Sequence, residues 1–121
     1  MTKSEINRNQ KIPKILFICN QNQNRSKTAE ELFKGQYDTA SAGLYNYPNQ
    51  VTVEQVTWAD VIIVFEAKQK QELANRFPKE CSGKEIVNLD IPDLYDYNVP
   101  SLVTALKQKM EKIRITRART V

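Results

Sequence analysis

Short apolar segments alternate with segments of helical periodicity along this chain of 121 residues, and this alternation constrains the fold more than any other feature. The apolar segments predict four strands, over 14–19, 38–44, 60–65 and 85–89. The segments between and after them predict four helices, from Ser26, over 51–58, over 67–77 and from Asn98, which we expect to cap the last one. Such alternation implies a parallel sheet with right-handed crossovers, so we predict a single three-layer α/β domain with a four-stranded parallel sheet and helices on both faces.

The ends of the chain differ in composition from the middle. The net charge is +4, and much of the excess lies near the two termini. We expect a flexible segment over 1–13, an α/β domain over 14–113 and a basic tail over 114–121. No aromatic residue interrupts the C-terminal basic run, so we expect no nucleic-acid partner. The longest apolar run, Val61 to Phe65, is too short to cross a bilayer, and we expect a cytoplasmic protein with no membrane partner.

The chain contains no histidine. This count excludes Cys-His and Ser-His-Asp catalytic arrangements. It also leaves few metal ligands, so we expect neither a metal nor another cofactor. The two cysteines, Cys19 and Cys81, are expected to stay reduced, with Cys81 in a structural role.

A polar loop follows the first predicted strand and begins with a thiol, in the stretch ICNQNQNRS. Loops between a strand end and a helix start point backbone N–H groups inward and bind anions. Those N–H groups and the Arg25 guanidinium would stabilise an ionised Cys19, while Arg25 could hold two phosphate oxygens in a fork. The loop lacks glycine, and we expect its three asparagines, at positions 20, 22 and 24, to supply any positive φ. The Ser26 hydroxyl is expected to donate to the sulfur.

These residues resemble the phosphate-binding loop of the low-molecular-weight protein tyrosine phosphatases. The matching pattern is Cys19, five residues, Arg25 and Ser26, between KILFI and TAEELF. Three later segments also resemble the family: SAG (41–43), ADVIIVFE (59–66) and IPDLY (91–95). The resemblance covers about 14–113, is closest to a short bacterial branch with a DIPD loop, and implies the Rossmann-like fold of that family.

The resemblance implies an enzyme that hydrolyses protein phosphotyrosine or small aryl phosphates through a phosphocysteine. Cys19 would be the nucleophile, Arg25 would hold the phosphate, and Asp93 would be the general acid, in competition with Asp90 and Asp96 for that role. The remaining implied site residues fall into three groups. The phosphate-binding loop is Asn20, Gln21, Asn22, Gln23, Asn24, Arg25 and Ser26; the supporting residues are Asn22, Ser26 and Ser41; the candidate pocket walls are Tyr45, Tyr47 and Tyr95.

The sequence also departs from the family pattern. Gln21 replaces the loop glycine, Asn24 replaces a second loop cysteine, and Lys27 and Leu94 replace prolines. Two other functions therefore stay open. One is an arsenate reductase on the same fold, for which Cys81 would have to pass on a disulfide. The other is a non-catalytic module that binds phosphate or a phosphoprotein. In each case the expected partner is a phosphorylated molecule or another oxyanion bound in the loop.

Overall fold

The computed structural model describes residues 10–113, 115 and 118–119. The elements follow in the order β1 (Gln10–Lys11), β2 (Lys14–Cys19), α2 (Arg25–Leu32), β3 (Asp38–Gly43), η1 (Tyr47–Asn49), α3 (Val53–Trp58), β4 (Val61–Val64), α4 (Ala67–Arg76), α5 (Pro78–Cys81), β5 (Glu85–Asn88), α6 (Pro100–Glu111) and β6 (Ala118–Arg119). Strands β3, β2, β4 and β5 form, in that order, a four-stranded sheet in which every pair is parallel. The predicted α/β architecture is therefore confirmed.

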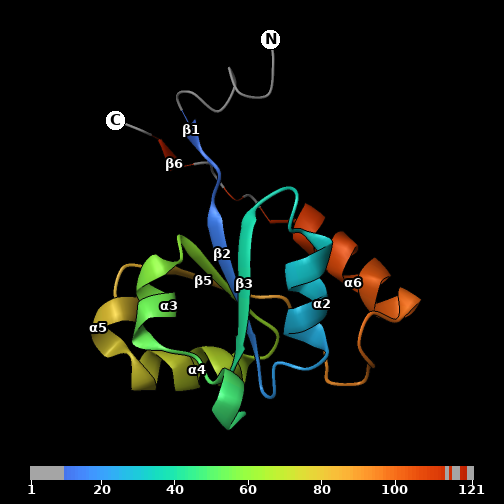
Figure 1. The fold of residues 1–121 in the computed structure, drawn as a ribbon, viewed down its shortest axis with the longest axis horizontal. Helices are drawn as coiled ribbons and strands as arrows, with labels where there is room; N and C mark the ends of the chain where they lie inside the picture. Colours follow the sequence, from blue (N-terminus) through green and yellow to red (C-terminus); the bar gives the residue numbers. More distant parts are fainter. Residues whose placement is uncertain (1–9, 114, 116–117, 120–121) are drawn as a thin grey trace.

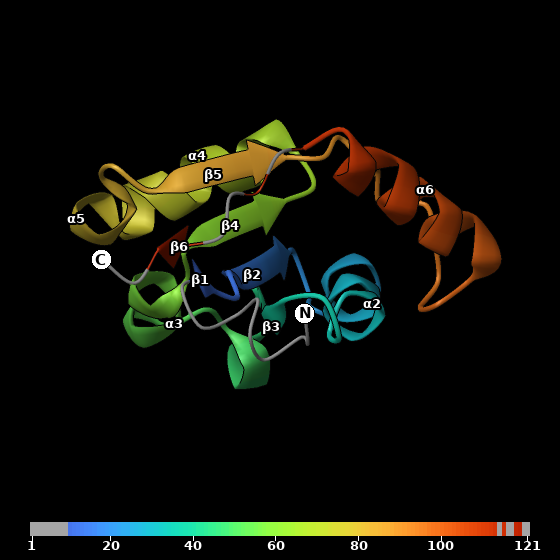
Figure 2. The same cartoon turned by 90° about the horizontal axis from the view of Figure 1, so that it is seen from above.

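Helices cover both faces of this sheet, as Figure 2 shows. Side chains alternate across the pleat of β2, so that Ile15, Phe17 and Cys19 enter one core while Leu16 and Ile18 enter the other. The first core is closed by α2 and α6, and the second by α3, α4 and α5. Burial on both faces explains why the two inner strands, β2 and β4, are continuous apolar runs.

Two details at helix ends differ from the prediction. Pro78, which follows the helix expected over 67–77, begins the short helix α5, because proline suits the first position of a new helix. The last helix is not capped by Asn98: its N-cap is Val99, and Asn98 has a φ of 59°. The Asn98 N–H donates instead to Thr28 Oγ1 at 2.9 Å, which ties the segment before α6 to α2.

The carboxyl ends of the four parallel strands lie at the same edge of the sheet, at the bottom of Figure 1. Strands β1 and β6 pair antiparallel beyond the opposite edge. Of the two expected terminal segments, 1–9, 114, 116–117 and 120–121 lie outside the described residues. No helix in the described part of the chain combines the length and the apolar character needed to cross a membrane.

Candidate active site

Cys19 ends β2 at the carboxyl edge of the sheet, and α2 begins six residues later at Arg25. The Cys19 side chain is buried. Its sulfur accepts a hydrogen bond from the Asn22 N–H at 3.2 Å and lies 3.0 Å from Ser26 Oγ. The predicted combination of a loop amide and the Ser26 hydroxyl around the sulfur is therefore present.

Asn22 gives the loop its sharp turn. Its φ is 55°, whereas Asn20 and Asn24 do not have positive φ. Of the three asparagines expected to supply a positive φ, only Asn22 does so. The Asn22 side chain also accepts a hydrogen bond from Ser26 Oγ at 2.8 Å. Asn22 thus contacts both Cys19, through its backbone, and Ser26, through its side chain.

The segment after β3 turns the loop carbonyls away from the sulfur. The N–H groups of Leu44 and Tyr45 donate to the carbonyls of Cys19 and Asn20 at 3.0 and 2.9 Å. The Asn46 side-chain amide donates to the Gln21 carbonyl at 2.7 Å. With these carbonyls bound on the outer side, the loop N–H groups are left for the inner side, where an anion would bind.

Arg25 is almost fully buried, with 1% of its surface exposed. Its Nη1 donates to Glu66 Oε2 at 2.7 Å and to the Ile91 carbonyl at 2.9 Å. Its Cζ lies 5.7 Å from the centre of the Phe65 ring. Because a buried cation without partners is costly, these contacts are what allow a guanidinium at this position.

Asp93 lies on the other side of the same guanidinium, with Oδ1 3.8 Å from Arg25 Nε. Its side chain is 57% exposed. The competing Asp90 is held in a local turn, since its N–H and carboxylate both bond the Asn88 side chain. Asp93 is thus the carboxylate of the late loop that lies beside Arg25.

A small cavity of about 40 Å³ joins these groups and is lined by Cys19, Gln21, Gln23, Asn24, Arg25 and Asp93. A larger cavity of about 380 Å³ lies between α2 and α6, away from Cys19. The small cavity contains the thiol, the guanidinium and the carboxylate, so we assign the candidate site to it. Within the described residues, no group of three or more cysteines and carboxylates is placed to hold a metal ion.

Two further residues hold the site, and the sequence prediction assigned no role to either. Glu66 lies two residues after the end of β4, at the N-cap of α4, and its carboxylate is the close partner of Arg25. Gln69 is buried; its Nε2 donates to Asn20 Oδ1 at 3.1 Å, and its Oε1 accepts from Phe65 N at 2.7 Å. Their position in the sequence could have pointed to such a role, because polar residues that follow a central strand lie at the ligand-binding edge of the sheet.

Ser41 lies outside the network around the sulfur that it was expected to join. It pairs with Phe17, two residues before Cys19, and its hydroxyl donates to the Glu30 carboxylate.

The three tyrosines do not line the small cavity. Tyr45 and Tyr47 are exposed, and the Tyr45 ring lies under the Arg76 guanidinium. Tyr95 packs against the core between the sheet and α6. The expected aromatic walls are therefore not formed around the sulfur in this structure.

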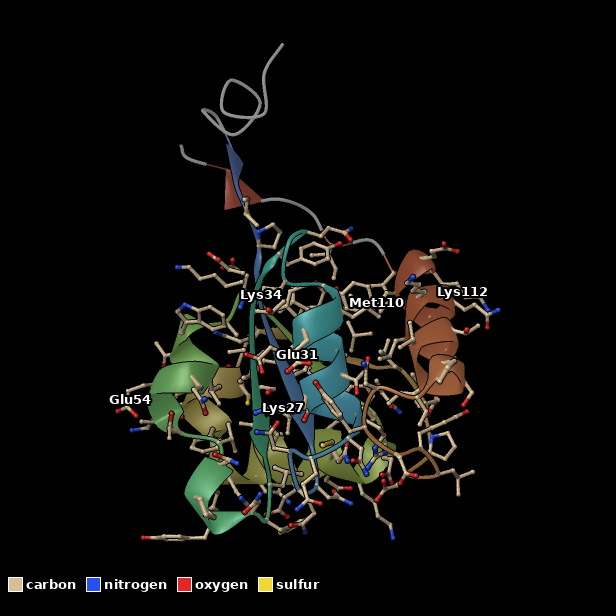
Figure 3. All side chains as sticks on the ribbon, turned by 45° about the vertical axis from the view of Figure 1, so that its right-hand side comes forward. Lys27, Glu31, Lys34, Glu54, Met110 and Lys112 are labelled. Carbon is tan, nitrogen blue, oxygen red and sulfur yellow. The ribbon has the colours of Figure 1, made fainter. Side chains whose placement is uncertain are left out.

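The two cysteines enter cores on opposite faces of the sheet. Burial raises the pKa of the Cys81 thiol, an effect that nearby Lys84 partly offsets. Lys27, which replaces a proline of the family pattern, lies on the exposed side of α2 in line with Glu31 and Lys34 (Figure 3).

No protein-family model matches this sequence, and no curated protein matches it either. Several solved structures match it. The tyrosine phosphatase AmsI of Erwinia amylovora superposes with a TM-score of 0.69 at 20% identity, over 83% of this chain and 89% of that one. The YwlE arginine phosphatase of Geobacillus stearothermophilus gives 0.66 at 18% identity, over 82% and 86%. A low-molecular-weight protein tyrosine phosphatase from T. tengcongensis gives 0.65 at 16% identity, over 82% and 93%. The chain therefore has the fold of the low-molecular-weight protein tyrosine phosphatases.

Proposed function

We propose that the chain is a phosphatase that transfers a phosphoryl group to Cys19 and then to water. The observation that carries this proposal is the shared cavity: the Cys19 sulfur accepts from a loop amide, beside the Arg25 guanidinium and the Asp93 carboxyl. The fold supports it, because solved neighbours with this fold are described as tyrosine and arginine phosphatases.

The first step is attack of the Cys19 thiolate on phosphorus. The bond from phosphorus to the leaving oxygen breaks, and Asp93, protonated at the start, gives its proton to that oxygen. The loop N–H groups and the Nε–Nη2 edge of Arg25 hold the three equatorial oxygens, where charge develops. The product is a phosphocysteine and an alcohol or phenol.

The second step returns the enzyme to its starting state. The Asp93 carboxylate accepts a proton from a water molecule as that water attacks phosphorus. The sulfur–phosphorus bond breaks, inorganic phosphate leaves, and the Cys19 thiolate is restored. The thiolate is the leaving group of this step, and the Ser26 hydroxyl, which lies 3.0 Å from the sulfur, donates a hydrogen bond to it.

Phosphotyrosine and small aryl phosphates are the first substrates to test, as the family resemblance implies. Phosphoarginine is a second candidate, because the solved neighbours with this fold include an arginine phosphatase.

The arsenate reductase alternative is not favoured by the positions of the two cysteines. That reaction would pass a disulfide from Cys19 to a second thiol, and Cys81 is the only other cysteine of the chain. A disulfide requires Cα atoms within about 7 Å, whereas the sheet separates the cores that contain these two residues. A non-catalytic phosphate-binding module would bind inorganic phosphate without hydrolysing any substrate, so measuring both properties distinguishes it from a phosphatase.

The deciding experiment measures hydrolysis of phenyl phosphate, para-nitrophenyl phosphate and phosphoarginine. Cys19→Ser is expected to abolish turnover while inorganic phosphate still binds. Asp93→Asn is expected to slow phenyl phosphate by about 10²-fold or more, and para-nitrophenyl phosphate much less, because nitrophenolate leaves without a proton. Asp96→Asn, an exposed carboxylate of the same loop, is the matched control and should behave like the parent. Phosphate binding by a parent protein that hydrolyses none of the three would leave the binding module as the function.

A further inference from the structure

We propose that Thr28 is a positioning residue, which holds the loop between β5 and α6 so that Asp93 stays beside Arg25. As far as turnover is concerned, this inference rests on the proposed function. Thr28 belongs to α2, and its side chain is buried. Its Oγ1 accepts a hydrogen bond at 2.9 Å from the N–H of Asn98, which lies 70 positions further along the chain.

The loop that carries Asp93 is tied at both of its ends to one side of α2. At the start of the loop, the Ile91 carbonyl accepts from Arg25 Nη1 at 2.9 Å. At its end, the Asn98 N–H donates to Thr28. Residues three apart lie on the same side of an α-helix, so Arg25 and Thr28 reach the two ends of the loop from neighbouring turns.

The middle of this loop lies at the surface. Residues 92–94 and 96–98 are exposed, and Asp93 Oδ1 is 3.8 Å from Arg25 Nε, which is farther than a hydrogen bond. The Tyr97 hydroxyl donates to the Glu31 carboxylate on the next turn of α2, also at the surface. Exposed loops with few buried contacts open readily, so the place of Asp93 depends on how firmly the two ends are held.

A purely structural role for Thr28 makes a different prediction. Helices α2 and α6 lie side by side (Figures 1 and 2), and α6 buries Leu102, Leu106 and Met110 in the core. If this packing alone fixed the loop, losing the Thr28 hydroxyl would lower stability and leave catalysis unchanged. Positioning instead predicts a loss confined to the step in which Asp93 gives its proton to the leaving oxygen.

The test compares kcat/KM for two substrates, because this ratio reports the steps up to release of the leaving group. Phenolate needs a proton in order to leave, whereas nitrophenolate does not. Thr28→Val keeps the shape of the side chain and removes the hydroxyl. We expect Thr28→Val to lower kcat/KM about fivefold for phenyl phosphate and less than about twofold for para-nitrophenyl phosphate.

Two variants provide the controls, and thermal unfolding first establishes that each protein is folded. Thr28→Ser keeps a hydroxyl and should restore most of the loss. Thr39→Val is matched in chemistry, because the Thr39 hydroxyl donates to the Glu30 carbonyl of the same helix at 2.9 Å, and it should hydrolyse both substrates like the parent. A change in the ratio of the two substrates as large in Thr39→Val as in Thr28→Val would overturn the inference.

A double-mutant comparison asks whether the hydroxyl acts through Asp93. In an Asp93→Asn background no proton transfer is left to support, so Thr28→Val should lower kcat/KM for phenyl phosphate by less than about twofold. A general loss of structure would lower it by the same factor in both backgrounds. Equal losses on both substrates, no loss on either, or equal losses in both backgrounds would each overturn the inference.

Amide exchange and backbone NMR relaxation detect the same tie without turnover. The Asn98 amide should exchange slowly in the parent protein, and Thr28→Val should speed its exchange and increase the motion of the Leu94 amide. An Asn98 amide that exchanges in the parent as fast as in an unstructured peptide would overturn the inference, whether or not any variant folds. If the parent hydrolyses neither substrate, the proposed function fails, and these measurements still decide whether Thr28 holds the loop.

Discussion

Gly43 is the position where adding one methyl group should damage the site most directly. A Cβ there would lie 3.0 Å from the Asn20 carbonyl oxygen, 3.0 Å from the Gln21 carbonyl carbon and 3.1 Å from the Asn22 nitrogen. Ordinary contacts begin at 3.4 Å, so the loop would have to move by about 0.4 Å. All three atoms are backbone, and the loop is already bonded to the segment after β3. It can therefore move only by disturbing the Asn22 N–H bond to the sulfur.

We expect Gly43→Ala to cost about 1–3 kcal/mol of unfolding free energy, as overpacking usually does. Displacing a catalytic loop by a fraction of an ångström should lower kcat/KM by about tenfold to hundredfold. Both are measurable, by urea unfolding and by hydrolysis of para-nitrophenyl phosphate at a temperature where every variant is folded.

The other two glycines of the chain provide matched controls. A Cβ at Gly35 would meet nothing within 4 Å, so Gly35→Ala should change neither stability nor activity. Gly83 also has open space but a φ of 75°, so Gly83→Ala should be destabilised by about 1–2 kcal/mol with unchanged kcat/KM. The reasoning fails if Gly43→Ala hydrolyses the substrate at the parent rate. It also fails if Gly83→Ala, at equal loss of stability, loses as much activity.

Two further predictions concern residues outside the site. Lys84 Nζ donates to the carbonyls of Val56, Thr57 and Ala59 at the end of α3. Lys84→Met should therefore lower the unfolding free energy, measured in urea, by about 1.5–3 kcal/mol. A change below about 0.5 kcal/mol would contradict this prediction. Burial raises the pKa of the Cys81 thiol, so in a Cys19→Ser background its alkylation by iodoacetamide should be slow at neutral pH and speed up only above the ordinary value of 9.0. Cys81→Ala should hydrolyse aryl phosphate like the parent, whereas arsenate-dependent oxidation that required Cys81 would revive the disulfide relay.

The two inner strands, β2 and β4, could be predicted closely because burial on both faces makes each of them a continuous apolar run. The run KILFIC corresponds to β2 without error, and the other three strands differ from the prediction by one residue at one or both ends. Helix ends were less predictable, since they depend on tertiary contacts. Asn98 is an example: its N–H bonds Thr28 from another helix, which its own neighbours in sequence do not indicate.

The meeting of Cys19 and Arg25 could be inferred from the residues, because the loop between a strand end and a helix start brings them together, and the family resemblance added Asp93. The roles of Glu66 and Gln69 could not, because they depend on where side chains point after β4. The same limit explains Ser41 and the tyrosines. Ser41 lies in the expected strand, but its register places the hydroxyl beside Glu30, and Tyr45 turns toward Arg76.

Asparagine at position 22 explains how this loop works without a glycine or a histidine. A glycine would adopt the positive φ but could not hold Ser26. The Ser26 hydroxyl has one proton and two neighbours, Asn22 Oδ1 at 2.8 Å and the Cys19 sulfur at 3.0 Å. With a neutral thiol, Ser26 can donate to Asn22 and accept from the sulfur. Once the sulfur is ionised it can only accept, so the Ser26 proton turns to it, and the Asn22 amide can rotate to donate its NH₂ group to Ser26. An amide side chain fits both arrangements, and this is the chemical reason for asparagine at this turn.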